Sequence, residues 1–249
     1  MGYNKLMTIK PMGDCAITLK FSEDINIDTH LKIKSLSEYL DKNPFEWMVE
    51  YVPSFVSLTI FYNPLEVIKE FSEKSDIPFN IVKSQIEKVL SKLEEKVIDN
   101  PKIVEIPVCY GGEFGPDLSF VAEHNNLTIE EVIDIHSSFE NRVYMIGFAP
   151  GFPYLAGMSN RISTPRRITP RLSIPAGSVG IAGNQTGVYP ISTPGGWQLI
   201  GRTPVDLFNP QSESPSILKA GDIVKFKEIL RKEYYEIKYS KEEKILKWA

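Results

Sequence analysis

The sequence has 249 residues, of which 42% are hydrophobic and 24% charged, and its formal net charge is −4. A chain of this length predicts one or two domains with a sizeable core. The acidic balance argues against a basic face for nucleic acid. The sequence contains no run of about 18 apolar residues, which a membrane-spanning helix would need, and MGYNKLMTIK lacks the apolar region of a signal peptide. Cys15 and Cys109 lie far apart and have no metal-ligand spacing. We therefore expect a cytoplasmic protein that binds neither nucleic acid nor a membrane.

Residues 1–100 have the pattern of a small α/β domain. Apolar residues at helical spacing predict helices over residues 27–40 and 79–97. The turn-like Asp99-Asn100-Pro101 places the domain boundary near residue 100. Segments rich in β-branched and aromatic residues predict strands over residues 16–21, 45–51 and 56–62.

Residues 101–249 show short strand-like segments separated by loops rich in glycine and proline. Asp117 can cap a first helix, and Thr128 with Glu131 forms a capping-box pattern that opens a second helix over residues 129–137. Regularly spaced short strands predict a barrel or a sandwich. We expect these strands at residues 102–109, 142–146, 178–182, 186–189, 196–201, 222–226 and 234–239.

Arginine is concentrated in this second region. Six of the seven Arg lie between Arg142 and Arg202, whereas no Lys occurs between Lys102 and Lys219. The planar guanidinium group binds carboxylates and phosphates through two parallel hydrogen bonds. The cluster therefore favours an anion site, and structural carboxylate pairs are the alternative for each single Arg.

The segment TPRRITPR, at residues 164–171, carries three of these arginines. Its prolines favour an extended backbone, in which alternate side chains point to opposite faces. Arg167 and Arg171 should therefore share one face, with Arg166 on the other. A solvated basic loop is the alternative to a binding site here.

Two further loops combine glycine and proline with aromatic rings. The loop at residues 147–155 can form a pocket wall, because glycine lets the backbone approach a ligand and the rings supply an apolar enclosure. A hydrophobic plug at one end of a barrel is the alternative. The Pro-Gly-Gly-Trp turn at residues 194–197 joins a tight turn to a large ring. The candidate wall residues are Phe148, Pro150, Gly151, Phe152, Tyr154, Pro194, Gly195, Gly196 and Trp197.

Familiar catalytic motifs are missing from the sequence. It contains no Walker A loop, no G-x-G-x-x-G after a strand, no G-x-S-x-G elbow and no HExxH. His136 is a possible acid or base, although as a cation at a helix C-terminus it would also suit the helix dipole. Asp117 is the other possible acid or base, and a helix cap is its structural alternative. The sequence shows no self-sufficient nucleophile and base and no metal-ligand set. We therefore expect the protein to be one subunit of a larger enzyme, a binding module, or a contributor to a shared active site.

Three long motifs resemble one bacterial family. They are IGFAPGFPYLAGM (146–158), TPRLSIPAGSVGIAGNQTGVYP (169–190) and STPGGWQLIGRTP (192–204). PMGDCA (11–16) and VPSFVSLTIFYNP (52–64) match more loosely. The chain resembles the B subunit of ATP-dependent 5-oxoprolinase, a family also described as KipI-type sensor-kinase inhibitors. It is also similar to the first subunit of allophanate hydrolase and to a part of urea carboxylase.

The resemblance implies an α+β chain of two domains: a small α/β domain at residues 1–100 and a cyclophilin-like β-barrel at residues 101–249. It also implies a complex of three different subunits, of which the C subunit is a related barrel and the A subunit completes the enzyme. Together they open the lactam of 5-oxo-L-proline to L-glutamate while ATP is hydrolysed. ATP is then a co-substrate of the complex. Because the chain has no Walker loop, we expect it neither to bind ATP alone nor to be active alone.

Opening a lactam requires a site that holds a carboxylate beside a charged transition state, and Arg groups and fixed amide donors suit this task. We expect one pocket, completed by the C subunit, in which aromatic rings exclude water. Gln185 and Tyr189 would orient the substrate. The candidates for binding the substrate or an anion are Arg142, Arg166, Arg171, Gln185, Tyr189 and Arg202.

Two other functions stay open at this point. The chain could inhibit a sensor histidine kinase, using the aromatic loop at residues 150–154 as a docking surface. It could also act on allophanate or another urea-derived amide, because Arg-rich pockets suit any small carboxylate. Peptidyl-prolyl isomerisation would rest on the barrel fold alone, and fold does not carry function.

Overall fold

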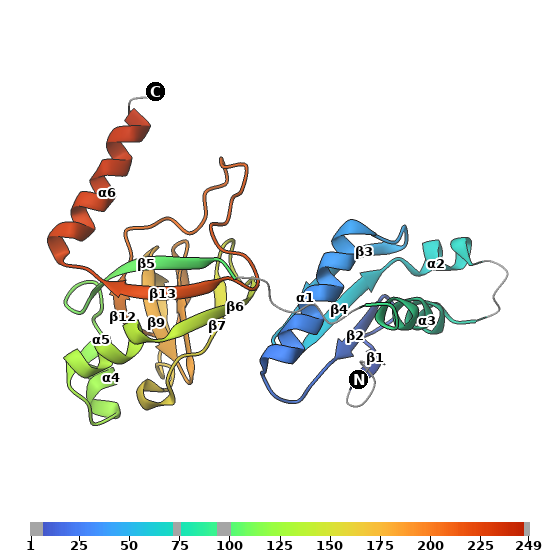
Figure 1. The fold of residues 1–249 in the computed structure, drawn as a ribbon, viewed down its shortest axis with the longest axis horizontal. Helices are drawn as coiled ribbons and strands as arrows, with labels where there is room; N and C mark the ends of the chain where they lie inside the picture. Colours follow the sequence, from blue (N-terminus) through green and yellow to red (C-terminus); the bar gives the residue numbers. More distant parts are fainter. Residues whose placement is uncertain (1–6, 72–75, 94–100, 247–249) are drawn as a thin grey trace. The chain divides into compact units, whose positions relative to one another are not determined.

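The fold is mixed α/β, with helices packed on sheets (Figure 1). The structure, a computed structural model, describes residues 7–71, 76–93 and 101–246. The chain forms two compact units, Met1–Asn100 and Pro101–Ala249. Within the described ranges, no helix is both long enough and apolar enough to cross a membrane.

The first unit contains a four-stranded antiparallel sheet with the strand order β1-β2-β4-β3. Leu19 of β2 pairs with Leu58 of β4, and both side chains are fully buried. Thr18 and Thr59 lie one position along, on the opposite face, with their hydroxyl oxygens 3.0 Å apart. One face of this sheet is therefore apolar and must be shielded from water by other elements. The strands are β1 (Thr8–Pro11), β2 (Ala16–Lys20), β3 (Met48–Pro53) and β4 (Ser57–Tyr62).

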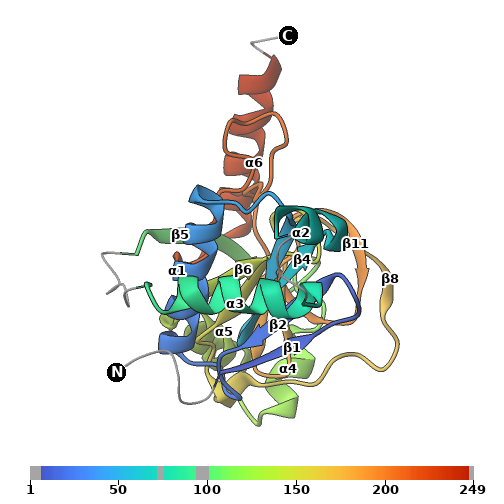
Figure 2. The same cartoon turned by 90° about the vertical axis from the view of Figure 1, so that its right-hand side faces the viewer.

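Helices α1 and α3 supply apolar residues to the cluster under this face (Figures 1 and 2). The Asn26 side chain caps α1 by accepting a hydrogen bond from the Thr29 N–H at 2.9 Å. The short helix α2, absent from the sequence prediction, begins at Pro64 after the cap residue Asn63. The predicted helix over residues 79–97 is too long, because α3 ends at Leu90, and residues 94–97 lie outside the described range. The bounds are α1 (Ile27–Lys42), α2 (Pro64–Glu70) and α3 (Pro78–Leu90).

The second unit is built on a seven-stranded sheet that curls into a nearly closed barrel. Its strand order is β10-β9-β12-β5-β13-β6-β7, and the two edge strands β10 and β7 lie against each other. β13 runs parallel to β5, and the other neighbouring pairs are antiparallel. The strands are β5 (Ile103–Tyr110), β6 (Glu140–Ile146), β7 (Pro153–Ala156), β9 (Ser178–Ala182), β10 (Gln185–Val188), β12 (Gln198–Arg202) and β13 (Ile223–Glu228).

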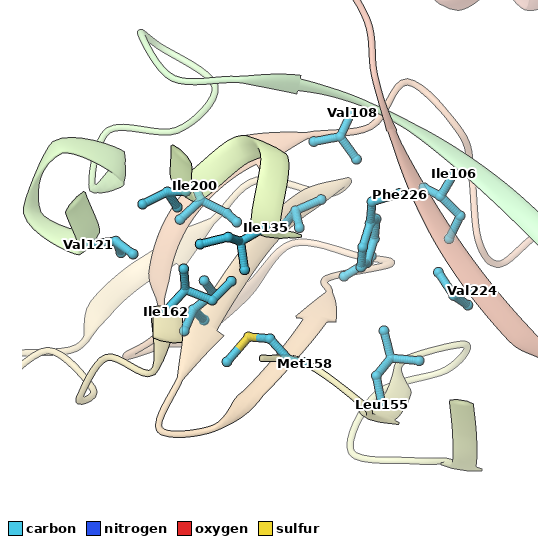
Figure 3. Close-up of a cluster of buried hydrophobic side chains, with 14 of the residues drawn as sticks. Ile106, Val108, Val121, Ile135, Leu155, Met158, Ile162, Ile200, Val224 and Phe226 are labelled. Carbon is cyan, nitrogen blue, oxygen red and sulfur yellow. The ribbon is translucent and has the colours of Figure 1, made fainter. Parts of the chain in front are cut away.

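Aliphatic side chains from the strands and from two helices fill the barrel (Figure 3). Helix α4 (Leu118–His124) contributes Val121, and α5 (Ile129–Ser138) contributes Ile135. The predicted capping box at the start of α5 is confirmed. Thr128 Oγ1 accepts from the Glu131 N–H at 3.1 Å, and the Glu131 carboxylate accepts from the Thr128 N–H at 2.8 Å.

A small two-stranded sheet lies beside the barrel strands in the second unit. β8 (Arg171–Ile174) pairs with β11 (Thr193–Gly195) in antiparallel register, and Figure 2 labels both strands at its right-hand edge. Residues 165–171, which we call the arginine arm, lead into β8. A 3₁₀ turn (Asn160–Ile162) precedes the arm.

The predicted strand over residues 234–239 is wrong, because these residues belong to helix α6 (Arg231–Leu246). Three tyrosines favoured a strand by propensity. Lys232 and Glu236, four positions apart, instead form an ion pair at 3.6 Å. The Tyr234 ring packs on Phe114 with 4.5 Å between centroids. The helix therefore buries the Tyr234 ring, a tertiary contact that strand propensity does not take into account.

Candidate functional site

The second unit contains a cavity of about 330 Å³, which we call the aromatic cavity. Four segments that are far apart in the sequence form its walls: the loop after β6, the arginine arm, the hairpin around β10 and the turn before β12. Its lining residues are Phe148, Phe152, Tyr154, Arg166, Gln185, Tyr189, Pro194, Gly195, Gly196 and Trp197.

Phe152 is the centre of the aromatic wall. Its ring meets Phe148, Tyr154, Tyr189 and Trp197 edge to face, with centroids 5.4, 5.3, 5.6 and 5.8 Å away. Such pairs stabilise beyond their buried area, by about 0.5–1.5 kcal/mol each. The wall is therefore packed before any ligand arrives.

Two positions in the cavity wall have distinctive local geometry. A Cβ at Gly195 would lie 2.7 Å from both the Tyr189 hydroxyl and Ile174 Cδ1, so a larger residue there would displace these side chains. Phe148 has φ +66°, which is unusual for a residue with a bulky side chain, and its residue surface is 67% exposed. Strain of this kind concentrates at ligand-binding positions. Phe148 is therefore a strained aromatic residue that lines the cavity and still faces solvent.

Three polar residues line the cavity beside the aromatic rings: Arg166, Gln185 and Tyr189. Burial raises the pKa of Tyr189 to about 12, although the positive charges of Arg166 and Arg171 oppose this rise. Tyr189 therefore stays protonated at neutral pH and can donate a hydrogen bond. One cation, one amide and one hydroxyl donor beside aromatic rings suit a small ligand with a carboxylate and an amide.

Residues of the aromatic loop and of the glycine turn both line the cavity, whereas Pro150 and Gly151 are absent from the lining. Gly151 has φ +78°, and a Cβ there would lie 2.7 Å from Phe208 Cβ. It therefore shapes the loop that presents Phe148 and Phe152.

Of the four arginines predicted to line or approach one pocket, Arg166 lines the cavity, and the charge of Arg171 acts on Tyr189 in its wall. Arg142 on β6 donates to the Gly221 carbonyl at 3.0 Å. Arg202 lies over the Phe114 ring, 5.7 Å from its centroid. Arg171 donates to the Asp117 carboxylate at 2.8 Å. These three satisfy local backbone, ring and carboxylate partners, which sequence position alone does not reveal.

His136 lies inside the barrel, outside the cavity lining. It is 1% exposed, and its ring nitrogens lie 2.7 Å from the Tyr110 hydroxyl and 2.8 Å from the Thr186 hydroxyl. Burial lowers the pKa of His136 to about 3, so the ring is neutral. This corrects the expectation of a cation at the end of α5.

Asp117 also lies outside the cavity lining, and its side chain does not cap α4. Its carboxylate accepts hydrogen bonds from Arg167 at 3.0 Å and from the Leu199 N–H at 2.7 Å, in addition to that from Arg171. The sequence analysis placed Arg167 and Arg171 on one face of an extended segment but did not identify their shared partner. Across the described ranges, no group of three or more His, Cys, Asp or Glu side chains could hold a metal ion.

Sequence analysis also missed two exposed apolar residues on and beside the arginine arm. Ile168 and Leu172 have relative exposures of 102% and 93%. The signal was visible in the sequence, because both are large aliphatic residues in a segment otherwise rich in Arg, Thr and Pro. Both side chains are therefore available for contact with another molecule.

Comparison with known proteins agrees with the motif resemblance. The family model described as carboxyltransferase domain, subdomain C and D, matches residues 7–218. A Bacillus subtilis protein named as the B subunit of 5-oxoprolinase is 54% identical over 230 residues, which cover 92% of this chain and 96% of the relative. A protein of the same name from Escherichia coli O157:H7 is 40% identical over 86% of this chain and 93% of the relative.

A solved structure, that of TTHA0988, superposes with a TM-score of 0.73 at 33% identity. The match covers 86% of this chain and 40% of the other, so the present chain corresponds to about two fifths of that longer protein. The sequence match to the 5-oxoprolinase relatives extends over nearly their whole length. This chain belongs to the family of 5-oxoprolinase B subunits.

Proposed function

We propose that this chain is the B subunit of an ATP-dependent 5-oxoprolinase. In this proposal it acts with the A and C subunits to open 5-oxo-L-proline to L-glutamate. The observation that carries the proposal is 54% identity to a protein named as the 5-oxoprolinase B subunit, over nearly the full length of both chains. The aromatic cavity is its proposed substrate site.

The chemistry of the cavity matches a small lactam acid. The Arg166 guanidinium can pair with the substrate carboxylate. The Gln185 side chain carries both an acceptor and a donor, as does the lactam amide. Tyr189 can donate to an oxygen, and the rings around Phe152 can pack on the five-membered ring.

A lactam is a poor electrophile, and coupling to ATP supplies the activation of its oxygen. The task of this chain is then to bind and orient the substrate and to exclude water from it. An orienting site lowers the barrier because reacting groups are already held in place. We place the ATP site elsewhere in the complex, so this chain alone should neither hydrolyse ATP nor form glutamate.

We further propose that the arginine arm is the contact surface for the C subunit, which thereby completes the cavity. Ile168 and Leu172 are almost completely exposed, and Arg166 on the same arm faces the cavity. Burying two aliphatic side chains in an interface between two proteins is favourable, at about 25 cal/mol per Å² of apolar surface.

We propose a cyclophilin-like barrel for residues 101–249, which fold independently of residues 1–100. Both cysteines, Cys15 and Cys109, are free thiols, which suits the reducing cytoplasm. Expression of residues 101–249 alone tests the independent domain, since a folded product with a cooperative thermal transition is expected.

Reconstitution of the complex tests the function. The purified A and C subunits are mixed with 5-oxoproline and ATP, with and without this chain, and glutamate is measured. The proposal expects ATP-dependent glutamate formation only in the complete mixture. Equal activity without this chain, or no activity when the three proteins are folded and co-purify, would overturn it. The same mixture should then be tried on allophanate, and the chain tested as an inhibitor of histidine-kinase autophosphorylation.

A further inference from the structure

The arginine arm brings Arg166 to the cavity from an irregular segment that runs from Pro165 to Pro170 and bends at residues 168 and 169. Arg166 itself forms no ion pair in the part of the chain that the structure describes. Its direction therefore depends on how the neighbouring residues of the arm are held.

The Asp117 carboxylate holds the arm from its other face. One oxygen, Oδ1, accepts from Arg167 Nη1 at 3.0 Å and from Arg171 Nη2 at 2.8 Å. The second oxygen, Oδ2, accepts from the Leu199 N–H of β12 at 2.7 Å. The Asp117 side chain is 7% exposed, so the carboxylate joins two arginines of the arm to a barrel strand in a site shielded from water.

Two further hydrogen bonds join the arm to the same stretch of chain. The Arg167 N–H donates to the Gly196 carbonyl at 2.7 Å, and the Gln198 side chain donates to the Pro165 carbonyl at 2.9 Å. Gly196 lines the cavity beside Trp197. These two bonds, together with the contacts of Asp117, hold the arm against the segment that also forms the glycine turn of the cavity.

Chain neighbours connect these contacts to Arg166. Arg167 and Arg171 contact Asp117, whereas Arg166, the residue before Arg167, lines the cavity. Holding Arg167 in place therefore limits the directions in which its neighbour Arg166 can emerge. Without the carboxylate, two guanidinium groups would share a partly buried site with no counter-charge, and the arm would have to move.

We propose that Asp117 is a positioning residue, which acts through the arginine arm to aim Arg166 at the carboxylate of the ligand. It does not line the cavity and touches no ligand there. This inference rests on the proposed function, because it assigns Arg166 the task of binding a carboxylate substrate.

The kinetic test uses the full chain in the reconstituted complex with the A and C subunits. Asp117→Asn keeps the size of the side chain and removes its charge. The expected result is a rise of tenfold or more in KM for 5-oxoproline, with kcat changed by less than about threefold. Asp134→Asn, at an exposed aspartate of α5, is the matched control and should leave both constants unchanged.

A double variant separates positioning from a general structural role. Residues that act through one another give non-additive effects. Asp117→Asn should therefore add less than about twofold to KM in the Arg166→Met background. Multiplication of the two separate effects would overturn the proposal. If Asp117→Asn does not fold, Arg171→Met, which removes one of the two arm contacts, takes its place with the same expectation.

Hydrogen exchange tests the arm without any activity. The Arg167 amide, which donates to the Gly196 carbonyl, should exchange at least tenfold faster in Asp117→Asn, whereas amides of β5 and β13 should not change. Unchanged exchange in the arm would overturn the positioning role. Loss of activity in the unaltered complex would instead count against the proposed function, so the two failures are distinguishable.

Discussion

Lowering the pH should destabilise this protein through one buried histidine. His136 lies between Tyr110 and Thr186, and its ring stacks on Phe226 at 4.5 Å. Thr186 donates its hydroxyl proton to the Gly180 carbonyl at 3.2 Å, so it must accept from His136 Nε2–H. Nδ1 is then the acceptor for the Tyr110 hydroxyl. One neutral tautomer satisfies the whole chain of hydrogen bonds.

The magnitude follows from the pKa of His136, which burial lowers from 6.5 to about 3. Between pH 6.5 and pH 3 the His136 ring is protonated in the unfolded chain and neutral in the folded chain. The contribution of His136 to the free energy of unfolding is therefore fully present above pH 6.5 and is lost as the pH falls toward 3. A drop from pH 7 to pH 5 should remove about 2 kcal/mol, because each unit below 6.5 costs up to about 1.4 kcal/mol.

Urea unfolding at pH 7 and pH 5 measures this loss, with His136→Gln as the comparison. Other titrating groups contribute equally to both proteins, so the unaltered chain should lose about 2 kcal/mol more than the variant. NMR supplies a second measurement, in which the His136 ring resonance should not shift between pH 8 and pH 5. Equal pH dependence of the two proteins, or a His136 ring that titrates near pH 6.5, would refute the reasoning.

Three more predictions concern residues in or near the cavity. Phe148→Gly removes backbone strain of about 1 kcal/mol and should leave the thermal midpoint of unfolding nearly unchanged. The same change should raise KM for 5-oxoproline. A lower midpoint with an unchanged KM would contradict this prediction. Arg202→Met should lower the free energy of unfolding by about 1 kcal/mol, because the contact with Phe114 is lost. A rise in KM without a loss of stability would instead indicate that Arg202 binds the substrate. The double variant Ile168→Ser with Leu172→Ser should keep its stability, because both side chains are exposed, and should bind the C subunit, in a titration, about tenfold more weakly. Unchanged binding would place the contact elsewhere.

Periodicity and capping signals predicted much of the fold. The capping box at Thr128 and Glu131 is local, since both partners lie in one helical turn, and it formed as expected. Tyrosine propensity failed for α6, where the Tyr234 ring packs on Phe114 from a helix. The ring contact joins residues more than a hundred positions apart, so no local pattern shows it.

Only part of the cavity lining has a signal in the sequence. The aromatic loop and the glycine turn carry their chemistry in adjacent residues, and most of those residues line the cavity. The arginines could not be sorted by sequence, because an Arg that pairs with Asp117 looks the same as one that faces a ligand. Asp117 itself was expected to act as a cap or an acid, and only the fold shows that it joins Arg167 and Arg171 to β12.

The central claim is that Arg166 binds the carboxylate of the substrate, and steady-state kinetics of Arg166→Met in the reconstituted complex test it most directly. A hydrogen-bonded charge contact contributes about 1.5–3 kcal/mol, so KM for 5-oxoproline should rise about 10- to 150-fold with a smaller change in kcat. Arg161→Met, at an exposed arginine of the 3₁₀ turn, is the matched control and should behave like the unaltered chain. A KM for Arg166→Met within twofold of the unaltered complex would contradict the account.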